Sequence, residues 1–384
     1  MPLRQPVRAV SWPAFAAVLG ATLLPGCGHT EPFSSPPPGT DLPFDPAEPV
    51  RLTLNAGGDR TASWLPDGSG ILYSTQLIFR DDRDVCLALL PPTGGAQREL
   101  WCDVPGDRAL TNVIQSPVAA PDGRLAFIAA NSTVGGTNPS FEAIAVAPSL
   151  LPESAVNLRR IPYSTDQGST HPAAGRLRWL GADRLAYLGQ AVAYRFPCEI
   201  CARDTITTGL AVATLDVGQP GSTPIVVPGT ESASGVASSA EGDLLFYTLG
   251  GDSRVFRRAL ASGEVTVVHD FGSAGIARDV DVVGNRLVAS VGGRVAFGPD
   301  ADLGPTQRDS GGVVHVVDLD SGAAVALDDP LRLYRRPALS PAGDRIVAEG
   351  YELVIVRFVD PVTEQMFADT TVSRSSDLYL LGAP

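Results

Sequence analysis

Ala62-Ser-Trp-Leu-Pro-Asp-Gly-Ser-Gly-Ile-Leu-Tyr73 is the stretch of sequence that decides the fold. It contains an apolar run, a tight turn at Asp67-Gly68 and a second apolar run, which is the pattern of a β-hairpin. Asp-Gly suits such a turn because glycine readily adopts positive φ. The pattern recurs in five further segments: Val118–Phe127, Leu177–Tyr187, Val236–Tyr247, Val280–Ala289 and Pro337–Ala348.

More strand-like runs follow these hairpins. The clearest are Val85–Leu90 with Gln97–Cys102, Gly209–Leu215 with Thr223–Val227, and Val313–Leu319 with Ala323–Leu327. Four short strands per unit, repeated six times, predict an all-β chain folded as a six-bladed β-propeller of four-stranded blades. A two-sheet sandwich is the alternative, but it leaves the repeat unexplained.

The ring of blades has to close, because an open last blade leaves an unpaired strand edge. The last unit ends at Leu378-Tyr-Leu-Leu381 with no following partner, while Val50-Arg-Leu-Thr-Leu54 precedes the first unit. We therefore expect residues 50–54 to supply the outer strand of the last blade.

Two of the turns also carry a family resemblance. Trp64-Leu-Pro-Asp-Gly68 and Leu339-Ser-Pro-Ala-Gly-Asp344 resemble the WD40-like repeat of TolB-type propellers, whereas the third to fifth units lack the proline. The resemblance covers residues 50–384 and implies the same ring closure by an N-terminal strand.

The N-terminus has the anatomy of an export signal. Arg4 and Arg8 precede an apolar stretch over residues 9–24, too short to be a clear membrane span. Leu24-Pro-Gly-Cys27 resembles the lipobox of bacterial lipoproteins, which implies a lipid anchor on Cys27 and cleavage after Gly26. Gly28, by the same resemblance, favours the outer membrane over the inner. The alternative is an ordinary secretory signal.

These features predict three parts: a lipoprotein signal peptide over 1–26, a Pro/Ser-rich tether over 27–49 and a propeller over 50–384. The expected location is the bacterial cell envelope, with the membrane contacted through lipid on Cys27. A net charge of −13 argues against nucleic acid as a partner. Every basic residue is Arg, which excludes lysine-based phosphate loops and Schiff-base chemistry.

Four cysteines remain beyond Cys27, and in an exported chain they predict disulfides. Cys86 and Cys102 flank a Pro-Pro-Thr-Gly-Gly turn on strands expected to be adjacent. Cys198 and Cys201 form a lone CxxC, for which a structural loop disulfide is favoured over redox activity. Without a second CxxC, a zinc site is not expected.

No catalytic residue can be named from the sequence. It lacks a Gly-x-Ser-x-Gly elbow, a His-Glu-x-x-His pair and a glycine-rich dinucleotide loop. His171 is the one candidate base worth following, while His269 and His315 read as residues of the blades. The acidic runs at 81–84 and 300–302 lack the spacing of a calcium loop. We therefore expect no metal and no cofactor.

A set of polar residues lies just before the innermost strands: Arg60, Gln115, Arg176, Arg278, Arg335 and Arg336. In a propeller such positions converge at one mouth of the central channel, so they predict a cationic funnel for an anionic ligand. The alternative is that Asp59, Asp183 and Asp279 neutralise these arginines as ordinary ion pairs.

These patterns predict a non-enzymatic, lipid-anchored envelope protein whose propeller binds a protein or an anionic envelope ligand. Loops near 131–140, 190–206 and 297–311 would add to the binding surface. The alternative is a propeller-type hydrolase or lyase that acts on peptide or glycan at the channel mouth. A third possibility is a structural spacer without a distinct pocket.

Overall fold

The computed structural model describes residues 48–54, 57–76, 85–102, 113–131, 140–151, 159–162, 173–195, 204–219, 221–292, 295–300, 304–308, 311–359, 366–373 and 375–384. Contacts divide the chain into Met1–Leu42 and Pro43–Pro384, and all described residues belong to the second unit. Within them, the single helix is a 3₁₀ turn, Gly272–Ala274, and no helix is long and apolar enough to cross a membrane. The predicted signal peptide, Cys27 and the predicted tether up to residue 47 lie outside the described residues.

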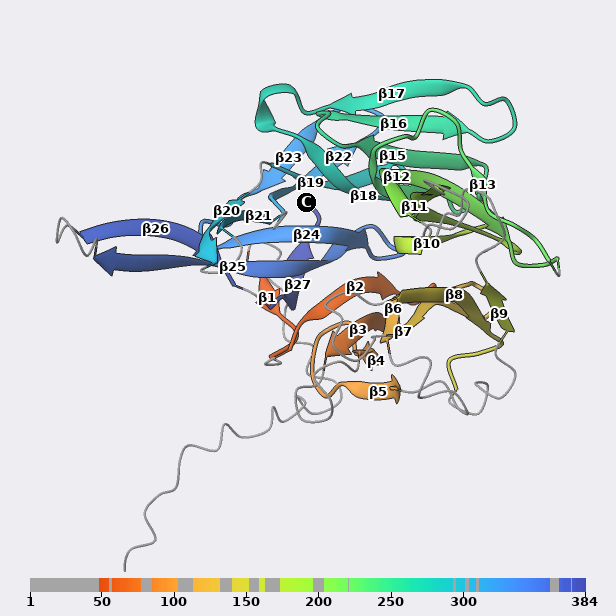
Figure 1. Cartoon of the computed structure of the whole chain (residues 1–384), viewed down its shortest axis with the longest axis horizontal. Helices are drawn as coiled ribbons and strands as arrows, with labels where there is room; N and C mark the ends of the chain where they lie inside the picture. The colour runs from red at the N-terminus through yellow and green to blue at the C-terminus, as the bar shows by residue number, and fades with distance from the viewer. Residues whose placement is uncertain are drawn as a thin grey trace, which may run out of the picture. The chain divides into compact units, whose positions relative to one another are not determined.

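The described residues form an all-β fold of antiparallel meanders (Figure 1). One blade contains β10 (Ala173–Leu180), β11 (Arg184–Arg195), β12 (Asp204–Asp216) and β13 (Ile225–Val226). The next contains β14 (Ala233–Ser238), β15 (Leu244–Leu249), β16 (Arg254–Ala259) and β17 (Val265–Asp270). A third contains β18 (Ala277–Val283), β19 (Arg286–Val291), β22 (Val313–Asp318) and β23 (Ala324–Leu327).

A fourth blade is built from both ends of the described chain. Its order is β1 (Val50–Arg51), β27 (Asp377–Gly382), β25 (Arg345–Val359) and β24 (Arg332–Leu339), and β26 (Met366–Val372) branches from β25. Val50 pairs with Leu380 and Arg51 with Tyr379, so β1 is the outermost strand. The predicted closure of the last blade by the N-terminal strand is therefore confirmed.

The first two predicted units are joined in one eight-stranded sheet. It contains β2 (Asp59–Trp64), β3 (Ile71–Gln76), β4 (Val85–Leu90), β5 (Arg98–Trp101), β6 (Val113–Ala119), β7 (Leu125–Asn131), β8 (Ser140–Ala147) and β9 (Arg159–Pro162). A single parallel bridge, Val85 to Val113, links the halves. Strand pairing thus gives four separate blades and this one joined sheet, rather than the six separate blades expected, because the bridge merges two of the predicted units.

The first strands of the meanders contact one another in sequence. β2 touches β6, β6 touches β10, and the series continues through β14, β18 and β24 back to β2. Hydrophobic cores fill the spaces between neighbouring meanders, as in the cluster of Leu52, Trp64, Tyr73 and Leu380 between the last blade and β2–β4. Facing sheets that share such cores around a ring of inner strands make this fold a β-propeller.

Hydrogen bonds also join neighbouring blades at the core edge. The Trp64 indole Nε1 donates to the Ala338 carbonyl at 3.0 Å, and Trp179 Nε1 donates to the Val118 carbonyl at 3.1 Å. Each indole therefore buries its apolar ring and still has a partner for its N–H.

Two hairpins extend beyond the regular blades. β20 (Val295–Asp300) pairs with β21 (Gly304–Arg308) between β19 and β22, and the distal half of β25 pairs with β26. Figure 1 shows the β25–β26 hairpin projecting away from the rest of its sheet. β20 contacts β26, so the two extensions lie side by side.

Candidate functional site at the arginine mouth

The innermost strands carry a repeated β-bulge near their first residues. The pairing register shifts between Arg60 and Ser63 in β2, and register shifts also occur in β6, β10, β14, β18 and β24. A residue with left-handed φ lies within four of these bulges: Thr61 (54°), Ser116 (50°), Arg176 (59°) and Arg336 (46°). Each costs roughly 1 to 2 kcal/mol for a residue with a side chain, so the surroundings must hold it in place.

Neighbouring strands provide that support through the amides of the four residues. Thr61 N–H donates to Glu349 Oε1 at 2.6 Å, and Ser116 N–H donates to Thr61 Oγ1 at 3.1 Å. Arg176 N–H donates to Ser116 Oγ at 3.1 Å, and Arg336 N–H to Asp279 Oδ2 at 3.1 Å. The bulges are thus linked from strand to strand at the centre of the ring.

The six residues singled out from the sequence occupy two levels of the channel rather than one. Arg60, Gln115 and Arg335 stand one residue before the bulge, and Gly175 takes this place in β10; Arg278 has the aligned position in β18, where it lies within the register shift. Arg176 and Arg336 stand at the bulge itself, and Asp279 takes the aligned position in β18, where it pairs with Ser290. We call the channel end beside these residues the arginine mouth.

The inner level is largely buried and holds shared ion pairs. Arg176 is 4% exposed, and its Nη2 lies 3.5 Å from Asp279 Oδ1. Arg335 Nε lies 3.4 Å from the other oxygen of Asp279. Arg336 Nη1 donates to both oxygens of Glu349 at 2.9 Å. The ion-pair alternative therefore holds for Asp279, which serves two arginines.

Asp183 and Asp59, the other two carboxylates expected to neutralise the arginines, lie in different surroundings. Asp183 pairs with Arg124 at 3.1 Å, at the opposite end of the channel. Asp59 is fully buried at the start of β2, where its backbone carbonyl accepts the Ser376 hydroxyl at 2.7 Å.

Burial and charge together set the protonation of the inner level. Burial alone would raise the pKa of Asp279 and of Glu349, but the adjacent arginines outweigh it and hold both pKa values below their usual range. Burial lowers the pKa of Arg176 to about 10, and Asp279 offsets part of this effect. All three groups are therefore charged at neutral pH.

A second buried pair was not anticipated from the sequence. Arg178 Nη2 lies 3.1 Å from Asp281 Oδ1, and Asp281 Oδ2 accepts the Leu339 N–H at 2.9 Å. The sequence does contain a signal for this pair. Arg178 and Asp281 each follow an inner-level residue by two positions, in strands that converge on the channel.

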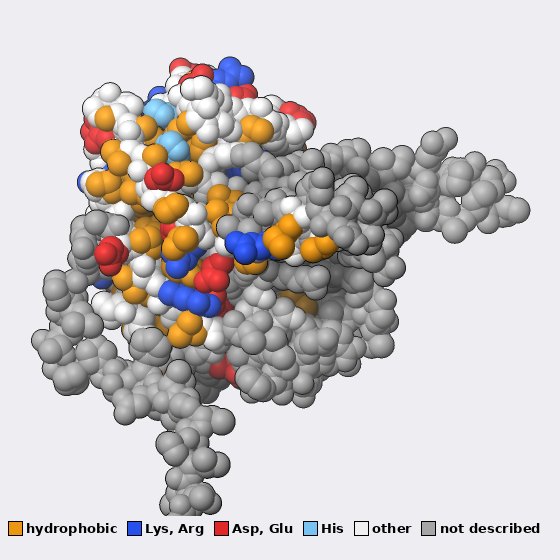
Figure 2. All heavy atoms as spheres, turned by 90° about the vertical axis from the view of Figure 1, so that its left-hand side faces the viewer, with side chains coloured by type: hydrophobic (Ala, Val, Ile, Leu, Met, Phe, Trp, Pro, Cys, Tyr) orange, Lys and Arg blue, Asp and Glu red, His pale blue; other side chains and the backbone are white. Residues whose placement is uncertain are grey.

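The outer level opens into a cavity of about 90 Å³. Its polar lining includes Arg60, Gln115 and Arg336 together with the hydroxyls of Thr61, Ser74 and Ser116. Arg60 is exposed, and no carboxylate of the described residues lies within ion-pair distance of it. Arg278 Nε donates to the Gly292 carbonyl at 3.1 Å. Figure 2 shows basic and acidic side chains side by side on this face of the molecule.

Three hairpin extensions rise on the same side as the arginine mouth. The outer parts of β11 and β12 pair through Arg195 and Asp204, beyond the point where β10 begins. β20–β21 and β25–β26 likewise continue past the first residues of β18 and β24. Of the regions near 190–206 and 297–311, expected to be loops, the described residues 190–195, 204–206, 297–300 and 304–308 belong to paired strands. Residues 132–139 lie outside the described part of the chain.

The opposite end of the channel is different in character. Tight turns such as Asp122-Gly123 surround a larger cavity of about 530 Å³, with Trp64, Trp179 and the Arg178–Asp281 pair in its wall. Its lining is mostly apolar, which leaves the arginine mouth as the more polar of the two ends.

Comparison with solved structures identifies the architecture. A gluconolactonase from Xanthomonas campestris matches with a TM-score of 0.50 at 14% identity, covering 87% of this chain and 89% of that one. TolB from Acinetobacter baumannii matches at 0.44 and 14%, covering 86% and 67%, and an oligogalacturonate lyase in complex with manganese matches at 0.43 and 10%, covering 88% and 93%. The chain has the fold of a β-propeller. No protein-family model and no curated protein sequence matches it.

These propeller structures correct one expectation. The sequence was interpreted as a non-enzymatic binding module, yet the propellers that it resembles include enzymes, with the gluconolactonase among them. The interpretation drew on the absence of familiar catalytic motifs, which are short sequence patterns belonging to other folds. A propeller assembles its site from residues far apart in the sequence, so the absence of such motifs does not exclude catalysis.

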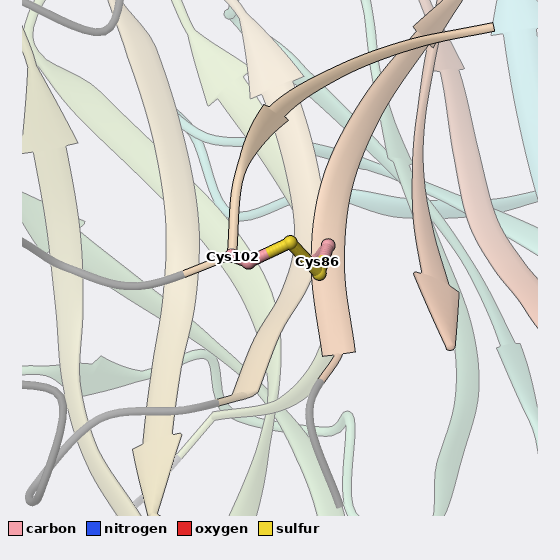
Figure 3. The surroundings of a disulfide bond; sticks show 2 residues. All are labelled: Cys86 and Cys102. Atoms are coloured by element: carbon pink, nitrogen blue, oxygen red, sulfur yellow. A yellow bond between two sulfur atoms is a disulfide. The ribbon is translucent and has the colours of Figure 1, made fainter. Parts of the chain in front are cut away.

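The predictions for the cysteines and the histidines have different outcomes. Cys86 and Cys102 form the predicted disulfide between β4 and the end of β5 (Figure 3). Cys198, Cys201 and His171 lie outside the described residues. His269 and His315 sit in neighbouring blades on either side of Phe271, at 4.5 and 5.2 Å between ring centres. Burial lowers the pKa of both histidines.

Proposed function

We propose that this chain is a propeller enzyme, a hydrolase or lyase, that acts on an anionic glycan or peptide at the arginine mouth. The observation that carries the proposal is the charge of this mouth. Arg60 is exposed there beside Arg336, while the only described carboxylates at the inner level, Asp279 and Glu349, are already engaged by arginines. The mouth therefore favours a negatively charged group from solvent, although the chain as a whole is acidic.

The two reaction classes share one electrostatic requirement. Acyl hydrolysis and elimination beside a carboxylate both build negative charge on a substrate oxygen in the transition state. A guanidinium held in place before the reaction stabilises such charge without reorganisation. Arg60 would bind the substrate carboxylate, and Gln115 would donate an amide hydrogen bond from the adjacent strand. The gluconolactonase that shares the fold supports the hydrolase reading.

The test is a substrate screen with the purified protein. Lactones, acyl esters and acidic peptides report hydrolysis, and uronic-acid oligosaccharides report elimination by absorbance of the unsaturated product. We expect turnover of at least one acidic substrate and a loss of about 10- to 100-fold in kcat/KM for Arg60→Gln.

The matched control is Arg257→Gln, which removes an exposed arginine from β16 in another blade. It should leave kcat/KM unchanged. The absence of turnover across the panel, or equal rates for Arg60→Gln and the wild type, would overturn the proposal.

We further propose that the propeller has six blades. Support comes from the six inner strands that contact one another in a ring and from six hydrophobic cores, each shared by two successive meanders. The single bridge at Val85 and Val113 then joins two blades at their edges. An experimental density map with six separate sheets would bear this out, and one with fewer would contradict it.

We propose that the protein resides in the bacterial envelope, where lipid on Cys27 anchors the propeller at the outer membrane. The Cys86–Cys102 disulfide supports an oxidising compartment. Metabolic labelling with a fatty acid should mark the wild type and not Cys27→Ser. Release of unlabelled wild-type protein into the soluble fraction would contradict the anchor.

A further inference from the structure

The centre of the channel contains a small space between the two mouths. This cavity measures about 10 Å³ and is lined by Thr61, Ala62, Ser116, Pro117, Arg176, Leu177 and Arg178. A space of this size has room for about one water molecule or one monatomic ion, and it excludes carboxylate or phosphate groups.

Arg176, the more buried of the two arginines in its wall, lacks a full set of hydrogen-bond partners. Arg176 is 4% exposed, and its Nε and Nη2 have no hydrogen-bond acceptor. Nη2 is 3.5 Å from Asp279 Oδ1, within ion-pair range but without a hydrogen bond. Asp279 is also shared with Arg335, so one carboxylate faces two guanidinium groups. Buried donors of a charged group without acceptors are costly, and an occupant that accepts hydrogen bonds would remove this cost.

The rest of the lining fits an acceptor that carries negative charge. Ser116 Oγ accepts the Arg176 N–H, which leaves its own hydrogen available to donate. Arg178 adds a second guanidinium, and its Nη2 also lacks a hydrogen bond. The side chains of Ala62, Pro117 and Leu177 are apolar and offer no acceptor to a water molecule or a cation.

We propose that this cavity binds one monatomic, monovalent anion of the chloride class, held by Arg176 with Ser116 and Arg178. The ion would neutralise buried positive charge that Asp279 shares between two arginines, and would hold β2, β6 and β10 together at the bulges. The inference does not depend on the proposed enzymatic function, because it concerns the channel centre and requires no substrate.

Bromide, which scatters X-rays anomalously and resembles chloride, is the direct probe. Crystals of the full chain soaked in sodium bromide should show an anomalous peak beside the Arg176 guanidinium. A position occupied by water alone, without anomalous signal, would overturn the proposal.

Thermal unfolding provides an independent measurement in solution. Sodium chloride and sodium bromide should raise Tm in a saturable manner, compared with sodium sulfate at equal ionic strength, because an ion that binds only the folded state stabilises it. Arg176→Gln should lose this halide-specific rise, and the control Arg257→Gln should retain it. Equal responses to halide and sulfate in the wild type would contradict the site. If Arg176→Gln does not fold, the bromide map of the wild type decides.

Discussion

Glu349 is the residue that ties the inner level of the arginine mouth together. Its fully buried carboxylate accepts the Thr61 amide at 2.6 Å, both contacts from Arg336 at 2.9 Å and the Tyr351 hydroxyl at 3.2 Å. A carboxylate with four such contacts, from three donor groups, can remain ionised in the core. It also supports the left-handed backbone at Thr61, so charge and backbone geometry depend on the same group.

Removing the charge of Glu349 should lower the free energy of unfolding substantially. Glu349→Gln would leave Arg336 without its counter-charge, and breaking a buried ion pair from one side typically costs about 3 to 5 kcal/mol. Because the Arg336 side chain is 25% exposed, we expect the lower end, about 3 kcal/mol in the free energy of unfolding measured with urea. Glu352→Gln is the matched control. Its side chain is 48% exposed and pairs with Arg51 at 3.5 Å, so a loss comparable to that of Glu349→Gln would refute the argument.

The same carboxylates predict how stability depends on pH. The pKa values of Asp279 and Glu349 are lower in the folded state than in an unfolded chain, where they are about 4. Their contribution is therefore fully present above about pH 4 to 5 and is lost as the pH falls through the folded values. Urea midpoints should drop between pH 5 and 3, and Glu349→Gln should flatten the drop. A midpoint that stays constant across this range would show that the two groups are not linked to folding.

The placement of single residues could be predicted only in part. The sequence repeat correctly predicted that Arg60, Gln115, Arg278 and Arg335 lie at one end of the inner strands. It grouped Arg176 with them, but the bulge in β10 puts Gly175 at that level and carries Arg176 one step deeper. Bulges add a residue without changing the hydrophobic pattern, so a comparison of sequences cannot locate them.

Individual strands were predicted well where turn chemistry marked their ends. The hairpin around Asp67-Gly68 and the closing pair of β1 with β27 follow directly from the pattern. The β20–β21 hairpin was not predicted as strands, because Gly298, Pro299, Gly304 and Pro305 are typical of loops. The β25–β26 extension has no turn signal at the point where β25 leaves its blade. Tertiary pairing, rather than local preference, defines both elements.

The disulfide acts at the scale of one hairpin. Cys86 and Cys102 are 16 residues apart and join β4 to the end of β5, next to the edge where β4 meets β6. Closing a loop of this length should stabilise the fold by roughly 3 kcal/mol, mainly by restricting the unfolded chain. The Cys86→Ala/Cys102→Ala variant should lower the free energy of unfolding by about 2 to 4 kcal/mol, and a reductant should affect only the wild type. Equal stability of the two proteins would mean that the pair contributes nothing.

The close approach of neighbouring blades leaves little room for a side chain at Gly235. A Cβ on Gly235 in β14 would lie 2.4 Å from the Arg278 carbonyl oxygen and 3.0 Å from Asp279 Cα, both backbone atoms of the next blade. Because backbone cannot move aside as a flexible side chain does, Gly235→Ala should destabilise the fold by about 1 to 3 kcal/mol in urea unfolding. It should also shift Asp279 within the inner level. Wild-type stability in this variant would mean that the blades are farther apart than described.

At the scale of the whole molecule, the ring is held closed by a few residues that precede the first blade. Besides the β1 pairing, Leu52 N–H donates to the Leu378 carbonyl at 2.7 Å, and Thr53 Oγ1 accepts the Leu378 N–H at 2.9 Å. Arg51 pairs with Asp377 at 2.5 Å, where burial raises the pKa of Asp377 and Arg51 opposes that rise. Leu52 also packs into the core between the last blade and β2–β4. Closure therefore combines strand pairing, charge and apolar burial.

Removing this segment should open the ring without touching the arginine mouth. A chain that begins at residue 55 would expose the β27 edge and lose the Leu52 contact, whereas one that begins at residue 48 keeps both. We expect the shorter chain to unfold at a lower urea concentration, to lose cooperativity and to associate through the free edge, seen as larger species in size-exclusion chromatography. The longer chain is the control and should behave as the full protein does. If both chains remained monomeric and equally stable, the blades would be held by their shared cores alone, and the N-terminal strand would be an addition to a ring that is already closed.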